Sequence, residues 1–135
     1  MGEKLQPKIV VIDDSESIRE TLMLYLDSCG FMNYEIYESA EDFRNYCAVR
    51  KVDFLITDYV LPGENGYDLA RVIKKRGHTF PILLLTLEHD ISIFSDYVDF
   101  VASKPLSLDE LDRIFAEALA NWNDSHGENN EPAFH

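Results

Sequence analysis

The sequence predicts an α/β protein built on a parallel, doubly wound sheet, and three observations carry that prediction. Short β-branched and apolar runs at 8–12, 52–57 and 81–85 have the length and composition of strands buried on both faces of a sheet. Segments with apolar residues at helical spacing separate these runs, which is typical of strand–helix–strand units. Each run ends in polar or turn residues, at the edge where ligands bind in open α/β sheets.

Helix-start signals place the first two helices. Ser17 and Glu20 fit a capping box, and the first helix is expected to run to Cys29, before a helix-ending Gly30. An exposed strand is expected over 33–37. Ser39 is then expected to cap a second helix. Its inward-facing positions are Phe43, Tyr46 and Cys47.

The second half continues the alternation. A third helix is expected over 67–76 and a fifth strand over 98–102, with a short or irregular fourth helix within 88–97. Ser107 and Glu110 form a capping box before the last helix. The apolar stripe of that helix is Leu111, Ile114, Phe115, Ala118, Leu119 and Trp122.

Length and composition indicate one domain and exclude several classes of function. The 135 residues suit a single domain over 7–122, with an N-terminal extension at 1–6 and a polar, disordered tail at 123–135. A net charge of −13 repels nucleic acid, so we expect no direct nucleic-acid binding. No run of about 18 apolar residues and no signal-peptide core occur, so we expect no membrane insertion and a cytoplasmic location. The two cysteines, Cys29 and Cys47, lack metal or redox spacing and are expected to be buried thiols.

Polar residues at the strand ends form a constellation with its own chemistry. Asp13-Asp14, Asp58 and Thr86 follow three strands, and Lys104 follows the last one. Three carboxylates close together repel each other unless a cation joins them, and oxygen ligands suit Mg²⁺. With a hydroxyl and an ammonium group added, these are the groups needed for phosphoryl transfer to an aspartate. Each residue alone could instead cap a helix or a turn; their joint placement favours the functional interpretation.

These motifs and the loop from Asp58 to Gly66 resemble the receiver domain of two-component response regulators, over about residues 7 to 121. The resemblance implies a flavodoxin-like (βα)5 three-layer sandwich with strand order 2-1-3-4-5. It implies that Asp58 accepts a phosphoryl group from a sensor histidine kinase or a histidine phosphotransfer protein, and that a downstream protein partner reads the change. Lys104 would pair with Asp58 and then the phosphate, before a cis peptide bond to Pro105.

The same resemblance assigns the metal ligands and the switch. Asp14, Asp58 and the backbone carbonyl of Val60 would bind Mg²⁺ directly, with Asp13 acting nearby through water. Thr86 would move to hydrogen-bond the phosphate. Such a domain is a signalling switch and not an enzyme.

Two departures from the family pattern affect function. Val101 stands where the family usually has an aromatic switch residue, and Phe100 is one place earlier, so a strand slip or bulge would be needed for Phe100 to replace it. Leu87 and Val60 are apolar at positions beside the phosphate, which predicts a long-lived phosphoryl group.

Three other functions stay open. The first is a receiver-like interaction module that works without phosphorylation. The second is an Asp-nucleophile phosphatase, which would need a second acid at position 60, and the third is flavin binding, which the acidic loop at 13–16 disfavours.

Overall fold

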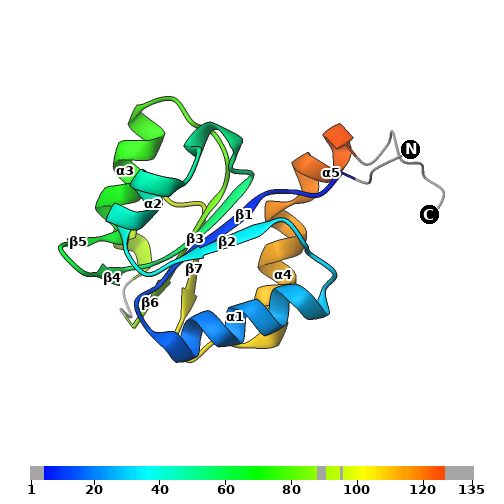
Figure 1. The fold of residues 1–135 in the computed structure, drawn as a ribbon, viewed down its shortest axis with the longest axis horizontal. Helices are drawn as coiled ribbons and strands as arrows, with labels where there is room; N and C mark the ends of the chain where they lie inside the picture. Colours follow the sequence, from blue (N-terminus) through cyan, green and yellow to red (C-terminus); the bar gives the residue numbers. More distant parts are fainter. Residues whose placement is uncertain (1–4, 88–90, 95, 127–135) are drawn as a thin grey trace.

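The computed structural model describes residues 5–87, 91–94 and 96–126, which form three layers. A parallel sheet is covered by α1 and α4 on one face and by α2 and α3 on the other (Figure 1). The main strands are β1 (Ile9–Ile12), β2 (Tyr34–Tyr37), β3 (Phe54–Asp58), β6 (Ile82–Thr86) and β7 (Phe100–Ser103). The α-helices are α1 (Glu16–Ser28), α2 (Ala40–Tyr46), α3 (Gly66–Lys75), α4 (Leu108–Ala118) and α5 (Ala120–His126). Shorter elements are η1 (Val49–Lys51), β4 (Val60–Leu61), β5 (Glu64–Asn65) and η2 (Ile91–Phe94).

The strands of the sheet have the order β2-β1-β3-β6-β7, and each pair of neighbouring strands is parallel. Since β4 and β5 form a separate antiparallel hairpin, this is the predicted order 2-1-3-4-5 of the main strands. Every residue of β1, β3 and β6 is buried, as expected for strands covered on both faces. The predicted α/β fold class is therefore confirmed, and the carboxyl ends of the strands share one edge.

Apolar side chains alternate between the two faces of the sheet and build two clusters. On the side of α1 and α4, Phe115 lies 5.1 Å from Tyr25 and 5.0 Å from Phe54, measured between ring centroids. On the side of α2 and α3, Phe94 lies 4.9 Å from Tyr59. Full burial of such a side chain contributes about 1.5–3 kcal/mol, so the clusters supply much of the stability.

The caps of the helices correct one prediction. Ser15 caps α1, because its extended backbone lets its side chain accept a hydrogen bond from the Ile18 amide. Ser17 lies inside the helix, so the predicted capping box at Ser17 is wrong. Ser39 and Ser107 cap α2 and α4 as predicted.

Two side chains expected to face inward do not. Tyr46 is 74% exposed, because α2 ends at this residue and the following Cys47 turns inward with an extended backbone. Cys29 is exposed at the C-cap of α1, beyond the last turn that packs on the sheet. Both thiols are free, and only Cys47 is the buried thiol that the sequence predicts.

Within the described part of the connection between β6 and β7, residues Ile91–Phe94 form a 3₁₀ helix, η2. Phe94 of η2 is buried, whereas Ile93 is 52% exposed. The predicted irregular helix within 88–97 lies partly outside the described residues, at 88–90 and 95. At the other end, α5 continues to His126, past the expected domain limit at 122, and the rest of the predicted tail, 127–135, lies outside the described residues.

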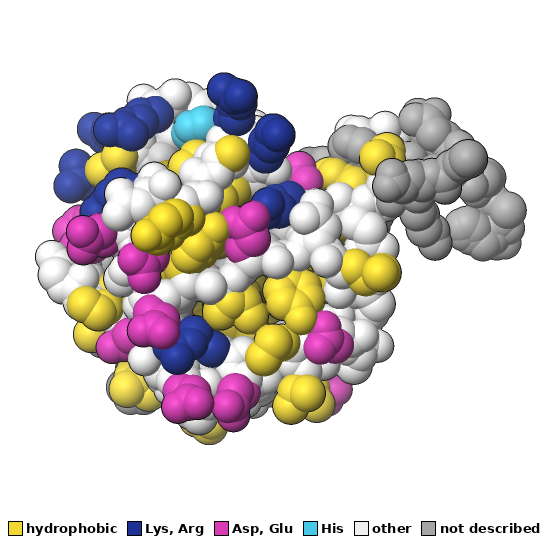
Figure 2. All heavy atoms as spheres, viewed as in Figure 1, with side chains coloured by type: hydrophobic (Ala, Val, Ile, Leu, Met, Phe, Trp, Pro, Cys, Tyr) yellow, Lys and Arg dark blue, Asp and Glu magenta, His cyan; other side chains and the backbone are white. Residues whose placement is uncertain are grey.

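Basic side chains gather on one part of the surface. Figure 2 shows a group of Lys and Arg side chains over the ends of α2 and α3 that lie far from the hairpin of β4 and β5. Six of the 12 basic residues of the chain fall in η1, in α3 and directly after it: Arg50, Lys51, Arg71, Lys74, Lys75 and Arg76. This grouping is notable in a chain with a net charge of −13.

Among the described residues, no helix combines the length and the apolar character needed to cross a membrane.

Candidate functional site

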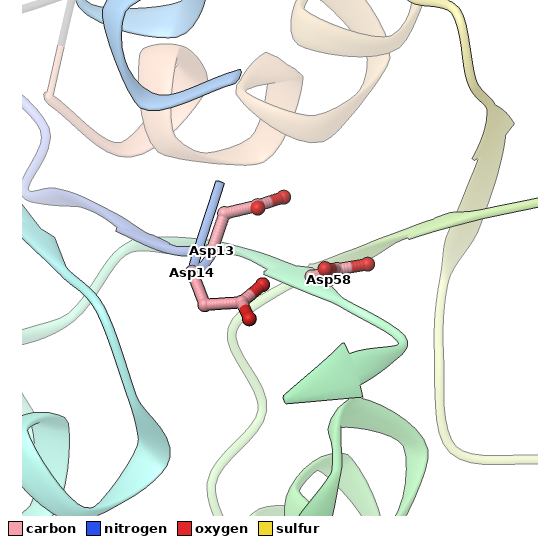
Figure 3. Close-up of side chains that lie close together, drawn as sticks. All are labelled: Asp13, Asp14 and Asp58. Carbon is pink, nitrogen blue, oxygen red and sulfur yellow. The ribbon is translucent and has the colours of Figure 1, made fainter. Parts of the chain in front are cut away.

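Three carboxylates meet at the carboxyl ends of β1 and β3. The parallel register pairs Ile12 with Thr57, so the residues that follow leave the sheet side by side. Figure 3 shows the side chains of Asp13, Asp14 and Asp58 directed into the same space. Each offers an oxygen within 4.8 Å of the others. Such a cluster of oxygen donors can hold a metal ion.

Asp13 is fully buried and only partly satisfied. Its Oδ1 accepts a hydrogen bond of 2.9 Å from the Ser15 amide, whereas its Oδ2 accepts no hydrogen bond from a described residue. Burial raises the pKa of Asp13, and the charge of Asp58 raises it further, although the Ser15 amide and Lys104 oppose the shift. The site therefore carries negative charge that its own donors do not fully compensate.

Lys104 reaches both buried carboxylates from the start of the loop after β7. Its Nζ lies 3.1 Å from Asp58 Oδ1 and 3.3 Å from Asp13 Oδ2. Burial alone would lower the pKa of Lys104, but the hydrogen bond to Asp58 and the two negative charges raise it overall. The ammonium group therefore stays charged at neutral pH. The Lys104–Pro105 peptide bond is cis, as the resemblance implies.

A cavity of about 470 Å³ opens beside these groups. Its wall includes Asp14, Asp58, Thr86 and Lys104 together with two apolar side chains, Val60 and Leu87. These two are 67% and 73% exposed, so they project beside the opening instead of packing into the core. The cavity thus combines hard oxygen ligands, an ammonium group and a buried hydroxyl residue with an apolar rim.

Two residues that support the site were not recognised in the sequence. A Cβ at Gly66 would lie 2.1 Å from the backbone oxygen of Asp58, so only glycine fits where α3 begins. Arg19 donates from Nη1 to the backbone oxygen of Asp13 at 3.0 Å. A glycine directly after the N-cap Asn65 was the available signal for the first. No pattern marks the second, because the hydrogen bond depends on how α1 packs over the end of β1.

Phe100 and Val101 point to opposite faces of the sheet. Phe100 packs on the cluster of α1 and α4, and Val101 on the cluster of α2 and α3. β7 pairs with β6 in regular register, Leu83 with Phe100 and Leu84 with Val101, so no bulge brings Phe100 to the face of Val101. Thr86, the other expected switch residue, is buried at the end of β6.

The matches to known proteins agree with this geometry. The family model of the response regulator receiver domain matches residues 9–115, and the chain therefore belongs to the response-regulator receiver family. The signal receiver domain of an HD domain-containing protein from Pseudomonas fluorescens Pf-5 superposes with a TM-score of 0.76 at 25% identity, covering 89% of this chain and 99% of that one.

Curated relatives are longer proteins. The transcriptional regulatory protein FixJ of Bradyrhizobium diazoefficiens is 29% identical over 82% of this chain and 56% of its own length. The phosphate regulon transcriptional regulatory protein PhoB of Pseudomonas aeruginosa is 34% identical over 76% of this chain and 47% of its own length. The chain thus spans about half the length of these relatives.

Proposed function

We propose that the chain is a phosphoacceptor switch in which Asp58 takes a phosphoryl group from a phosphohistidine in a Mg²⁺-dependent reaction. The observation that carries the proposal is the contact of Lys104 with both Asp58 and Asp13. The Asp13 oxygen in this contact, Oδ2, is buried and accepts no hydrogen bond from a described residue. The donor is a sensor histidine kinase or a histidine phosphotransfer protein, and a protein partner reads the change in the cytoplasm.

The residues at the site fit a small divalent cation. The carboxylates of Asp14 and Asp58 and the backbone carbonyl of Val60 would hold Mg²⁺, with Asp13 close by through water. The ion supplies charge neutralisation on the phosphoryl oxygens.

The chain's own residues perform the transfer. A carboxylate oxygen of Asp58 bonds to phosphorus while the phosphorus–nitrogen bond of the donor breaks, and the electron pair stays on the imidazole, which takes a proton from solvent. Lys104 lies 3.1 Å from Asp58 and stabilises the charge of the incoming phosphoryl group. Thr86 lines the same cavity and offers its hydroxyl to a phosphoryl oxygen.

Labelling with acetyl phosphate or a phosphohistidine donor tests this function. We expect Mg²⁺-dependent incorporation into the wild-type chain and none into the Asp58→Asn variant. Asp53→Asn is the matched control, because Asp53 directly precedes the amino end of the strand that ends at Asp58. Equal labelling of the Asp58→Asn variant would overturn the proposal.

The apolar rim supports a slow loss of the phosphoryl group. Val60 and Leu87 border the cavity without offering a hydrogen bond from their side chains to an attacking water. We expect the Leu87→Ala variant to lose phosphate several times faster than the wild-type chain, and Leu108→Ala, another exposed leucine outside the cavity, to match the wild type. Decay of the wild-type phosphoprotein within seconds in Mg²⁺ buffer would contradict a long-lived state.

A further inference from the structure

A second, larger cavity lies at the opposite edge of the sheet, among the amino ends of β3, β6 and β7. Its volume is about 700 Å³, and α4 and α5 close one side of it. Three half-buried aromatic side chains, Phe80, Phe100 and Trp122, contribute to its wall. The wall also contains polar and charged residues, so an opening of this size can take a bulky apolar side chain only where these aromatic side chains lie.

Basic side chains border this cavity. Arg50 lines it, and Lys75 and Arg76 directly precede Gly77 and His78, which line it as well. Arg50, Lys51, Lys75 and Arg76 are all exposed, and no ion pair joins any of them to another described residue. By contrast, the neighbouring Lys74 is held by Asp99 at 2.8 Å.

Helix stability explains only part of this basic group. Lys75 lies in the last turn of α3, where positive charge interacts favourably with the helix end. Arg50 and Lys51 belong to a different segment, η1. Because η1 has only three residues, the interaction of positive charge with a helix end explains these two residues less well. Arg50 therefore brings positive charge to the wall of the cavity, in a chain with a net charge of −13. Lys51, Lys75 and Arg76 add positive charge one or two residues away from residues that line it.

We propose that this amino-edge cavity docks an acidic segment of a partner protein that carries a bulky apolar side chain. The apolar side chain enters among Phe80, Phe100 and Trp122, and the acidic residues beside it meet Arg50 and Arg76. This surface is separate from the phosphoacceptor cavity, since the two share no lining residue.

Charge favours a protein segment over a nucleic acid. The chain has a net charge of −13, and a duplex spanning the molecule would bring phosphates against its many acidic residues. Three acidic residues line the cavity, and each has a partner. Asp53 accepts from the Lys8 amide, Asp99 accepts from the Ile82 amide and from Lys74, and Glu117 lies 3.6 Å from Arg113. A short peptide can keep its carboxylates on the basic side of the opening.

Trp122 provides a direct reporter, because it is the single tryptophan of the chain. The probe is a synthetic peptide in which a Leu-Phe pair is flanked on both sides by glutamates. We expect this peptide to change the tryptophan emission of the wild-type protein, and added salt to weaken the effect. A control peptide with two alanines in place of the Leu-Phe pair should bind at least ten times more weakly.

Charge reversal at one arginine separates docking from general attraction. Arg50→Glu should weaken peptide binding at least tenfold, whereas Arg44→Glu should change it less than twofold. The two variants alter net charge equally, but Arg44 is paired with Glu64 on the hairpin and does not line the cavity. Both residues are exposed, so both variants should fold.

Four results of the binding measurements would overturn the proposal. They are no emission change up to about 1 mM peptide, equal binding of the alanine control peptide, equal weakening by both arginine variants, and tighter binding of a DNA duplex than of the peptide. Self-association of the chain that the Arg50→Glu variant abolishes would likewise assign the surface to a second copy and overturn it.

Discussion

Aspartates occur at both edges of the sheet, but their surroundings differ. At the amino edge, Asp99 Oδ2 accepts hydrogen bonds of 2.8 Å from the Ile82 amide and from Lys74. Asp53 Oδ2 accepts one of 2.8 Å from the Lys8 amide. At the carboxyl edge, three carboxylates lie together, and Lys104 contacts only two of them, Asp13 and Asp58. Asp13 Oδ2 accepts no hydrogen bond from a described residue.

This difference separates structural from chemical carboxylates. An aspartate that ties two strand ends together has its charge met by amides and a lysine, so burying it stabilises the fold. A group of aspartates with too few donors costs stability and is useful only if a cation or a phosphoryl group joins it.

The largest contrast is expected between two lysines. Lys104→Met should slow labelling of Asp58 by about 10²–10³-fold, the usual cost of removing one preorganised electrostatic contact. Lys74→Met removes the ion pair with Asp99 but should leave the labelling rate unchanged. Time courses with acetyl phosphate measure both. Equal rates for the two variants would show that Lys104 has no chemical role.

The next largest contrast is expected in the stability cost of replacing a glycine by alanine at each edge of the sheet. Gly66→Ala places a Cβ 2.1 Å from a backbone oxygen of Asp58. We expect it to lower the free energy of unfolding by about 3 kcal/mol. Gly77 has φ +96° with open space around it, so Gly77→Ala should cost only about 1–2 kcal/mol. Urea denaturation of both variants measures the difference. A smaller loss of unfolding free energy for Gly66→Ala than for Gly77→Ala would mean that the backbone at the carboxyl edge can shift to accept the added Cβ.

Magnesium should stabilise the chain through the carboxyl edge alone. At about one hundred times its Kd, Mg²⁺ should add about 2.7 kcal/mol to the free energy of unfolding. Asp14→Asn should abolish this gain, whereas Asp53→Asn should keep it. Thermal unfolding with and without Mg²⁺ measures the effect. A gain that survives in the Asp14→Asn variant would place the ion elsewhere.

The smallest expected effect is the change in stability when an aspartate is replaced by asparagine. It is the most specific prediction, because the change has opposite signs at the two edges of the sheet. The pKa of Asp13 is raised in the folded chain, so its protonated form stabilises the fold below its unfolded pKa. That contribution is lost as the pH rises through the raised value, and at pH 7 the buried charge is unfavourable. Without metal at pH 7, Asp13→Asn should therefore raise stability by about 1 kcal/mol, whereas Asp99→Asn should lower it by about the same amount.

The pH dependence provides the control for these two variants. The gain from Asp13→Asn should shrink as the pH falls below the raised pKa, since the wild-type group is then neutral too. Denaturation curves at several pH values test this. A loss of stability in the Asp13→Asn variant at neutral pH would show that Lys104 and Ser15 compensate Asp13 fully.

Much of the fold was predictable because local patterns and the sheet agree. Uniformly apolar runs identify β1, β3 and β6, and the rule that parallel strands end at one edge brings Asp13, Asp14, Asp58 and Lys104 together. Ser39 and Ser107 cap helices by accepting hydrogen bonds from amides three residues further on, so the signal is contained in the local sequence. These features depend on neighbours in sequence or on the direction of a strand.

The rest depends on contacts between distant segments. Tyr46 was misassigned because α2 ends at this residue and the extended backbone of Cys47 departs from the helical spacing that the sequence suggests. The need for glycine at position 66 comes from the close approach of α3 to the end of β3. Whether Phe100 could replace Val101 depended on the register with β6, which a single sequence does not contain.

The group of positive side chains around η1 and the end of α3 affects how the molecule is oriented when it approaches a charged partner, as well as what it binds. Because half of the basic residues of the chain gather in this region, its charge is unevenly distributed and the chain has a permanent electric moment. A charged surface exerts a torque on such a body before contact. A positively charged partner would therefore meet the acidic end first, and encounters would become less oriented as ionic strength rises.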